Sequence, residues 1–325
     1  MWINDRLYGR SEVKDEVLVE LMRSGPMQRL KWVTQTGIPV KVAHHRTYSR
    51  YEHSVGVMLL LRKFGASQEE QIAGLLHDVS HTAFSHVIDW VMGNPKEENY
   101  QDSVLAEHIG RDPIKGILKR HGFDVKTVSE LEHNGKYRLL ERDLPDLCAD
   151  RLDYAMRDTT YWLNADVKPC LNGLVVRDNE FMFDSVTAAR KFGNYYMKCQ
   201  KGYWGSPEWK VRYHLLSNAL KIAMDKKIIG MDDLYRKEQE IIKKVRVEGD
   251  NEEIRLMNLA LGNVKYMVCE DGDIVLTKKK RYIDPKFIDR SGKVMRLSQV
   301  DAKFKELIRS ERSARKEDRA RIISR

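Results

Sequence analysis

The stretch SQEEQIAGLLHD, residues 67–78, decides the fold. Ser67 followed three residues later by Glu70 is a capping-box signature for the start of a helix. The apolar positions within residues 72–76 continue that helix, so His77 and Asp78 are expected near its C-terminal end. An imidazole and a carboxylate at the end of an apolar helix indicate a helical core that carries a chemical site.

Helical patterns also surround this stretch. Residues 11–24 place Val13, Val17 and Leu21 at four-residue intervals behind a Ser11 cap, which is typical of an amphipathic helix. Further helices are expected at 27–35, 51–63, 102–109, 114–120, 144–158, 186–201 and 211–247. Turn residues between short apolar runs predict β-hairpins at 173–183 and 265–278. The predicted fold class is mostly α, a helical-bundle core with a small α+β C-terminal appendage that contains short β-hairpins.

Composition narrows the class of protein. A chain of 325 residues with 42% hydrophobic residues can bury a sizeable core. Its net charge of +9 favours anionic partners such as nucleotides or nucleic acid. The four cysteines include no Cys-x-x-Cys pair, so reduced thiols are expected. There is no signal-peptide pattern and no apolar stretch of bilayer length, so we expect a cytoplasmic protein without membrane contact.

The dipeptide His77-Asp78 suggests the chemistry of the site. Divalent metals that activate water on a phosphate take imidazole and carboxylate ligands from rigid elements and keep at least one position open. Neighbouring residues on a helix diverge by about 100°, so the pair can share one ion only near a helix end or across a groove. A second element must supply the other ligands, and ten histidines leave that choice open on pattern alone.

Four blocks in order resemble the motifs of the HD-domain phosphohydrolases. They are SRYEHSVGV (49–57), AGLLHD (73–78), FSH (84–86) and DRLDYAMRD (150–158). Similarity at residues 3–5 and 27–35, the opening helices, and at 282–285 and 297–298 extends the resemblance to the branch of deoxynucleoside triphosphate triphosphohydrolases. It implies that His53, His77, Asp78 and Asp150 bind a divalent metal ion, with Asp153 as the alternative to Asp150. Manganese, iron, magnesium and zinc all suit this ligand set.

The same resemblance implies the substrate contacts. Gln35 and Asp158 match positions that contact the sugar 3′-hydroxyl, and Tyr154 matches one that packs where a 2′-hydroxyl would lie. Arg50 and Arg151 match positions that approach phosphates. For Arg50, pairing with a neighbouring carboxylate is the alternative.

The catalytic group implied by the resemblance is a histidine. His86 matches the proton donor to the leaving 5′-oxygen, and Asp89, one turn later, is expected to orient it by accepting the other ring proton. His81 is expected to line the phosphate pocket, with a role only in holding the loop as the alternative. The implied reaction is attack of metal-activated water on the α-phosphorus, which releases a deoxynucleoside and intact triphosphate.

Departures from this branch keep other functions open. Residues 80–83 are Ser-His-Thr-Ala where the branch has a Gly-His-Gly-Pro-like run, and Gln101 stands where it carries another catalytic histidine. A glutamine amide cannot transfer protons as imidazole does. Lys210 and Arg212 are available as further phosphate contacts, and the aromatic residues at 195–209 are expected to pack in the core rather than stack on a base. The alternatives are an HD-type phosphohydrolase or phosphodiesterase on another nucleotide or nucleic acid, and a catalytically impaired nucleotide-binding regulator.

The chain divides into three predicted parts. Residues 1–165 form the HD-domain catalytic core, 166–262 a helical continuation with a hairpin that completes the substrate pocket, and 263–325 a small α+β appendage with a basic tail. Basic residues outnumber acidic ones in 309–325. A solvated or frayed helical tail is expected there, with a nucleic-acid contact as the alternative. The resemblance also implies a nucleotide substrate, a dNTP, and a homo-oligomer.

Overall fold

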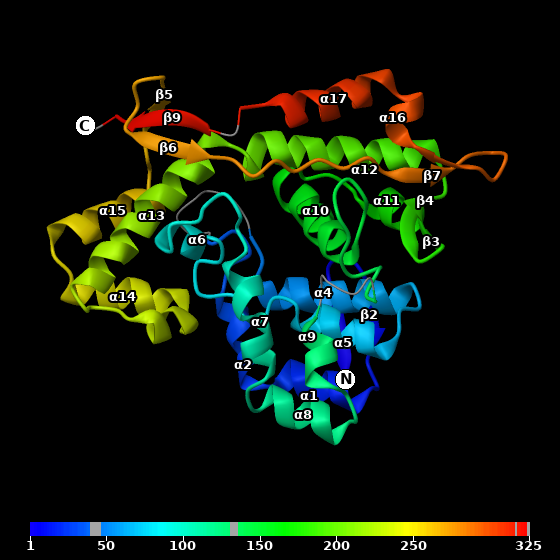
Figure 1. Cartoon of the computed structure of the whole chain (residues 1–325), viewed down its shortest axis with the longest axis horizontal. Coiled ribbons are helices and arrows are strands. Elements are labelled where there is room, and N and C mark those ends of the chain that lie inside the picture. The colour runs from blue at the N-terminus through cyan, green and yellow to red at the C-terminus, as the bar shows by residue number, and fades with distance from the viewer. Residues whose placement is uncertain (40–46, 131–135, 316, 324–325) are drawn as a thin grey trace.

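The structure, a computed structural model, describes residues 1–39, 47–130, 136–315 and 317–323. Helices make up most of these residues, and short strands form small sheets (Figure 1). The predicted fold class, mostly α with an α+β C-terminal part, is confirmed. No helix within the described ranges has the length and apolar character needed to span a bilayer.

Three helices form the centre of the N-terminal half, α4 (Arg50–Lys63), α5 (Gln68–Leu76) and α10 (Ala149–Trp162). Helix α4 packs against both of the others, and its residues 53–61 are all buried, as expected for a helix covered on every side. Ser49 begins α4 with a complete capping box, in which its hydroxyl accepts from the Glu52 amide and the Glu52 carboxylate accepts from the Ser49 amide. A Cβ at Gly56 would lie 2.1 Å from Arg157 of α10, so this glycine allows the two helices their close approach.

Shorter elements cover this centre. They are the hairpin β1 (Trp2–Asp5) and β2 (Gly9–Glu12), α1 (Glu16–Arg23), α2 (Gly25–Arg29), the 3₁₀ turn η1 (Leu30–Trp32), α7 (Tyr100–Ile109), α8 (Ile114–Arg120) and α9 (Val125–Ser129). Apolar side chains from α1, α7, α8 and α9 join those of α4 and α5 in one buried cluster. The loop that precedes α6 (Val87–Val91) leaves this cluster and leads toward the second helical layer.

The second layer is built from α11 (Lys168–Asn172), α12 (Val186–Cys199), the π-helical turn η2 (Gln200–Trp204), α13 (Pro207–Asp225), the 3₁₀ turn η3 (Met231–Tyr235), α14 (Glu238–Glu248) and α15 (Asn251–Leu261). Helix α12 packs against α10, and α13 packs against both α15 and α6 (Figure 1). The turn η2 redirects the chain between α12 and α13. Its Trp204 ring therefore meets Tyr154 of α10, with ring centroids 5.3 Å apart.

Two sheets belong to the C-terminal part. One has the strand order β3 (Leu174–Arg177), β4 (Glu180–Phe183), β7 (Lys286–Ile288) and β8 (Val294–Arg296), and the other has the order β5 (Tyr266–Val268), β9 (Glu317–Ile322) and β6 (Ile274–Thr277). The hairpin predicted at 173–183 is confirmed by the antiparallel pairing of β3 with β4. Helices α16 (Leu297–Val300) and α17 (Ala302–Ser313) connect the sheets, and Figure 1 shows α17 beside α12.

The prediction for the end of the chain is wrong in two respects. Strands β5 and β6 do not form the hairpin predicted at 265–278, because β9 lies between them and pairs antiparallel with both. The tail predicted to be helical at 309–325 is a helix only as far as Ser313, and strand β9 follows it. Only Ala320 of β9 is buried, so the strand carries almost no apolar alternation that would reveal it.

Several predicted helix boundaries are also wrong. Residues 9–12 belong to β2, so α1 begins at Glu16 behind Asp15 rather than behind Ser11. Residues 3–5, expected in an opening helix, are part of β1, and the helix predicted at 27–35 ends at Trp32 after a 3₁₀ turn. The helix predicted at 144–158 begins only at Ala149. The pattern at 211–247 is α13, η3 and α14, separated by turns.

Only one of the two hydrogen bonds of the capping box predicted at residues 67–70 is present. The Ser67 hydroxyl accepts from the Glu70 amide at 3.1 Å, as expected. The Glu70 carboxylate instead accepts from the amides of Leu139 and Leu140, which brings the chain before α10 onto the start of α5. His77 is the C-cap residue of α5, in the position that the sequence predicted.

Candidate metal centre

Three of the four residues predicted as metal ligands, His53, His77 and Asp150, have ligand atoms within 4.8 Å of one another. His53 of α4 and His77 at the end of α5 have their Nε2 atoms 3.2 Å apart. Asp150 Oδ1, from the first turn of α10, lies 2.8 Å from His53 Nε2 and 3.5 Å from His77 Nε2. Asp78 lies beside this group, with Oδ1 3.5 Å from His77 Nε2 and Oδ2 3.8 Å from His53 Nε2.

The hydrogen bonds of the two histidine rings fit a cation between them. His77 Nδ1 lies 2.8 Å from the Gly74 carbonyl, which can only accept, so Nδ1 carries the proton and Nε2 a lone pair. His53 Nδ1 lies 2.8 Å from a carboxylate oxygen of Asp153, which gives the same tautomer. With Nδ1 protonated in both rings, the two Nε2 atoms 3.2 Å apart need a cation near them, either a metal ion or a proton on His53 that is donated to Asp150. Nitrogens about 2.1 Å from one ion, at tetrahedral or octahedral angles, would be about 3.0 to 3.4 Å apart.

Asp153, the alternative ligand, lies behind His53 rather than beside the other ligands. Its carboxylate accepts from His53 Nδ1, from Arg157 Nε at 2.7 Å and from the Tyr8 hydroxyl at 2.8 Å. Carboxylates in this position fix the orientation and tautomer of a metal-binding imidazole. The geometry therefore favours Asp150 as the ligand and Asp153 as its support.

The two arginines predicted to approach phosphates are held by protein groups. Arg50 donates to Asp78 Oδ2 at 2.6 Å, to the Ser85 hydroxyl at 2.7 Å and to the Gln35 carbonyl at 3.3 Å. Burial alone raises the pKa of Asp78, but Arg50 holds it well below its usual range. Arg151 donates to the backbone carbonyls of residues 146 and 142 at 2.7 and 3.1 Å. The carboxylate pairing expected as the alternative for Arg50 is thus present.

The predicted catalytic histidine stands beside its predicted partner. His86 Nδ1 lies 3.4 Å from Asp89 Oδ2, and 23% of the His86 side chain is exposed toward the cavity. His81 is fully enclosed, with Nε2 3.2 Å from Asp78 Oδ1. Burial holds the pKa of His81 well below its usual value, so its ring is neutral and can donate to Asp78.

The turn that carries His86 is held by a contact with α14. Phe84 and Ser85 adopt φ values of 64° and 48°, a left-handed conformation that non-glycine residues rarely take. The Phe84 amide donates to Glu238 of α14 at 3.2 Å, and the same carboxylate oxygen accepts from the Thr34 amide at 2.9 Å. Glu238 therefore fastens the His86 turn to the segment that carries Gln35.

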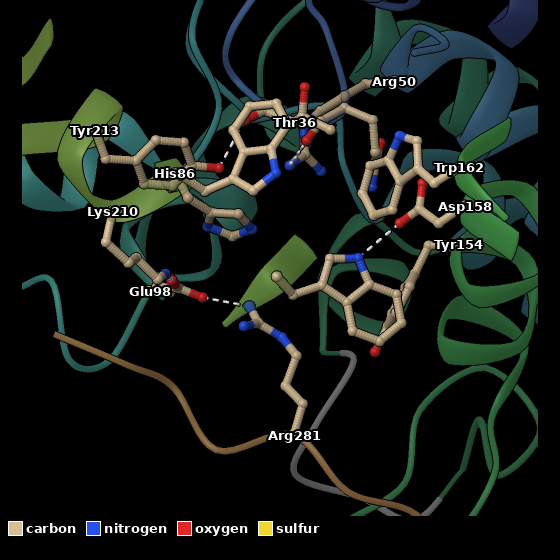
Figure 2. Close-up of a pocket in the computed structure, with 13 residues that line it drawn as sticks. Thr36, Arg50, His86, Glu98, Tyr154, Asp158, Trp162, Lys210, Tyr213 and Arg281 are labelled. Carbon is tan, nitrogen blue, oxygen red and sulfur yellow. Dashed lines mark hydrogen bonds and ion pairs between the residues drawn. The ribbon is translucent and has the colours of Figure 1, made fainter. Parts of the chain in front are cut away.

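Beside the candidate ligands lies a cavity of about 110 Å³ with aromatic walls, shown in Figure 2. Its walls include the rings of Tyr154, Trp162, Trp204, Trp209 and Tyr213. A larger cavity of about 610 Å³ contains His77, Asp78 and Asp150 in its lining. The two cavities share Gln35, Arg50, His86, Glu98, Tyr154 and Arg281, so they are contiguous. An elongated ligand can therefore place an apolar ring in the first and a charged end in the second.

Two buried acceptor atoms face the aromatic cavity. Trp204 Nε1 donates to Asp158 Oδ2 at 2.7 Å, whereas Asp158 Oδ1 and Gln35 Oε1 are buried without a hydrogen-bond partner among the described residues. Burial raises the pKa of Asp158 to about 7. Because buried polar atoms are normally hydrogen-bonded, Gln35 Oε1 and Asp158 Oδ1 are candidate acceptors for a ligand hydroxyl, and Tyr48 also hydrogen-bonds the Asp158 carboxyl group.

The opposite end of the cavity is charged. Glu98 accepts from Lys210 Nζ at 3.0 Å and forms an ion pair with Arg281 (Figure 2). Arg212, the other cation expected as a phosphate contact, donates instead to the carbonyls of residues 260 and 262 and is absent from the cavity lining. Gln101 lines the larger cavity, where its amide donates to Asp102 at 2.9 Å.

Sequence reasoning missed several residues of this cavity. The sequence assigns no role to Trp162, Glu98 or Arg281, and it favours core packing over base stacking for Trp204 and Trp209. The one local signal was the concentration of tryptophan, since three of the six in the chain lie between residues 162 and 209. Large rings that exceed what a core needs often line a ligand pocket.

Comparisons with known proteins agree with this geometry. The family model described as HD domain matches residues 50–158. The Bacillus subtilis protein YdhJ is 38% identical over 296 residues, which cover 89% of each chain. A phosphohydrolase structure from Bacteroides thetaiotaomicron covers all of both chains with a TM-score of 0.73 and 16% identity, which shows a shared fold.

Two relatives with named activities align over shorter stretches. A metal-dependent phosphohydrolase from Cordyceps militaris is 41% identical over 156 residues, 48% of this chain and 44% of that protein. The human deoxynucleoside triphosphate triphosphohydrolase is 32% identical over 142 residues, 37% of this chain and 22% of that enzyme. The chain thus spans less than half the length of either protein. From the family match, the full-length relative and the clustered ligands, we conclude that the chain belongs to the HD-domain family of metal-dependent phosphohydrolases, with a divalent metal ion as its cofactor.

Proposed function

We propose that this phosphohydrolase cleaves deoxynucleoside triphosphates to a deoxynucleoside and intact triphosphate. The observation that carries the proposal is the aromatic cavity that adjoins the four candidate ligands and presents two buried, unpartnered acceptor oxygens. Similarity to the human triphosphohydrolase, and to one from Dictyostelium discoideum at 31% identity over 192 residues, supports this substrate.

In this proposal, the nucleoside occupies the aromatic cavity. The rings of Trp162, Trp204 and Trp209 offer stacking faces for the base. The 3′-hydroxyl has one proton to donate, so it satisfies one of the two buried oxygens, Gln35 Oε1 or Asp158 Oδ1. Tyr154 is fixed by a 3.0 Å hydrogen bond to the Tyr196 hydroxyl and leaves little room for a 2′-hydroxyl.

The reacting phosphate then lies between the metal ligands and His86. A divalent ion held by His53, His77, Asp78 and Asp150 supplies charge stabilisation on the phosphate and a lowered pKa for water. Gly74 and Asp153 keep the two ligand rings oriented. His86 donates a proton to the leaving 5′-oxygen, and Asp89 stabilises the protonated ring before transfer.

The test is product analysis by mass spectrometry with manganese, iron, magnesium or zinc supplied separately. The substrates are dNTPs, NTPs, nucleoside monophosphates and cyclic dinucleotides, and the Asp150→Ala variant controls for contaminating activity. Deoxynucleoside plus intact triphosphate from a dNTP, absent in the variant, is the expected result. Release of orthophosphate alone, or turnover only of a substrate without a triphosphate, would contradict the proposal.

One observation favours a second candidate, an HD-type enzyme for a nucleotide with fewer phosphates. Arg50, Arg151 and Lys210 all bond to protein acceptors, so less cationic charge is available to a triphosphate than the sequence suggested. Gln101 also lacks the proton-transfer capacity of histidine. Cleavage of monophosphates or cyclic dinucleotides in preference to dNTPs, in the same panel, would support this candidate.

A further inference from the structure

Arg281 reaches the substrate cavity from outside the segment that matches the HD domain. It belongs to the extended chain between β6 and β7, more than a hundred residues after the matched segment ends. Figure 2 shows its guanidinium projecting into the cavity toward Glu98. Arg281 lines both the aromatic cavity and the larger cavity that contains candidate ligands. It therefore stands where a phosphate joined to a bound nucleoside must lie.

The availability of the Arg281 guanidinium distinguishes it from Arg50. Arg50 uses Nε, Nη1 and Nη2 on protein acceptors, and its side chain is 3% exposed. Arg281 pairs with Glu98 through Nη2, and 19% of its side chain remains exposed in the cavity. A planar guanidinium with accessible N–H groups matches the geometry of phosphate oxygens.

Glu98 holds Arg281 without neutralising the site. It is buried, adopts a left-handed φ of 51°, and is shared between Arg281 and Lys210. Burial alone raises the pKa of Glu98, but Arg281 and Lys210 hold it well below its usual range, so it stays ionised. Two cations against one carboxylate leave one positive charge at the junction of the cavities.

The C-terminal sheet holds this arrangement from outside. Lys279 Nζ donates to the Glu97 carbonyl at 2.9 Å, and Glu317 of β9 pairs with Lys96 at 2.9 Å. The two residues that precede Glu98 are thereby tied to segments that the HD match does not include. The C-terminal part thus contributes Arg281 and its supporting contacts to the wall of the cavity.

We propose that Arg281 binds a phosphate of the substrate and that Glu98 presents it at the junction of the two cavities. The identity of that substrate rests on the proposed function, whereas the phosphate contact itself does not. Arg281 is then a specificity-determining residue, because it selects ligands that carry phosphate beyond the nucleoside.

Calorimetric titration of the metal-loaded protein with inorganic triphosphate tests the proposal. Removing one charge-assisted contact in Arg281→Gln is expected to weaken binding about 10- to 100-fold. Arg281→Lys keeps the positive charge but loses the planar guanidinium. Its triphosphate affinity should lie between that of Arg281→Gln and that of the wild type. Arg309→Gln, which changes an arginine of α17 whose side chain is 81% exposed, should bind triphosphate as the wild type does. Deoxynucleoside affinity should not change in any variant, while KM for the nucleotide follows triphosphate affinity.

Equal triphosphate affinity in the wild type and Arg281→Gln overturns the proposal. A parallel loss of deoxynucleoside affinity also overturns it, because the residue then shapes the cavity as a whole. If the wild type releases no deoxynucleoside from any dNTP while Arg281→Gln still loses triphosphate affinity, the proposed substrate fails and the phosphate contact stands. Should Arg281→Gln not fold, the Arg281→Lys comparison carries the same test.

Discussion

Replacement of Asp158 by Asn is expected to stabilise the fold at pH 8 while impairing catalysis. Asp158 is 3% exposed, and burial raises its pKa from 3.8 to about 7. The unfolded chain therefore releases this proton more readily than the folded one. The protonated Asp158 carboxyl group stabilises the fold fully below about pH 4. This stabilisation is lost as the pH rises to about 7.

The magnitude follows from the size of this pKa shift. One pKa unit corresponds to about 1.4 kcal/mol, so ionisation of Asp158 costs about 4 kcal/mol of folding free energy at pH 8. At pH 5 the cost is about 1.5 kcal/mol, because only the pH interval between the pKa of the unfolded state and pH 5 contributes to it. Asn keeps an oxygen for Trp204 Nε1, although its own N–H groups must find acceptors. We expect a net gain of about 2 kcal/mol at pH 8 and almost none at pH 5.

Urea unfolding at both pH values measures this difference. A chelator is included throughout, so that loss of metal at low pH affects the wild type and the variant equally. The Asp178→Asn variant serves as a control, because this side chain is 85% exposed at the tip of the β3–β4 hairpin. Deoxynucleoside release by metal-loaded Asp158→Asn should fall at least about tenfold as an acceptor for the sugar is altered. A variant less stable than the wild type at pH 8, or one equally stabilised at both pH values, would refute the reasoning.

Four further changes test other parts of the site. Asp150→Ala should remove metal binding and turnover together, as measured by metal analysis after dialysis and by product release. Asp153→Asn should lower metal affinity about 10- to 100-fold in a chelator competition, because the support behind His53 is weakened, and an unchanged affinity would contradict that role. Gln101→His should raise kcat, because it supplies a proton-transferring group to the larger cavity. Unchanged rates in both Gln101→His and Asp150→Ala would contradict the assignment of the site. Deletion of residues 317–325 should lower the Tm and raise KM, because β5 and β6 lose the strand between them and Lys96 loses its partner.

The part of the site that sequence could predict is the part built from local signals. Ser49 and Ser67 each begin a helix that brings a histidine to the centre, and those starts are encoded within four residues. The apolar run before His77 ends the helix where an adjacent aspartate can turn toward the same point. Asp150 followed from the family resemblance, because pattern alone did not separate it from Asp153. The structure distinguishes them by the face of His53 that each one meets.

The part that could not be predicted depends on contacts between distant segments. Glu98 and Arg281 lie 183 residues apart and carry no motif. Strand β9 pairs with β5 and β6 across about 40 to 55 residues, and its charged sequence has no apolar alternation. Glu70 does not make its predicted capping bond, because its carboxylate accepts from two backbone amides before α10 instead. In each case a tertiary contact outweighed or replaced the local preference.

This division separates the evidence for chemistry from the evidence for substrate. The segment that matches the HD domain, residues 50–158, contributes the candidate ligands and His86. Trp204, Trp209, Lys210 and Arg281 lie beyond it, and they form much of the cavity that receives the substrate. The relatives with named activities align over less than half of this chain, so they support a metal-dependent phosphohydrolase more than a particular nucleotide. Variants of the candidate metal ligands test whether the chain is a hydrolase. Variants of Trp204 and Arg281 test which phosphate ester it binds.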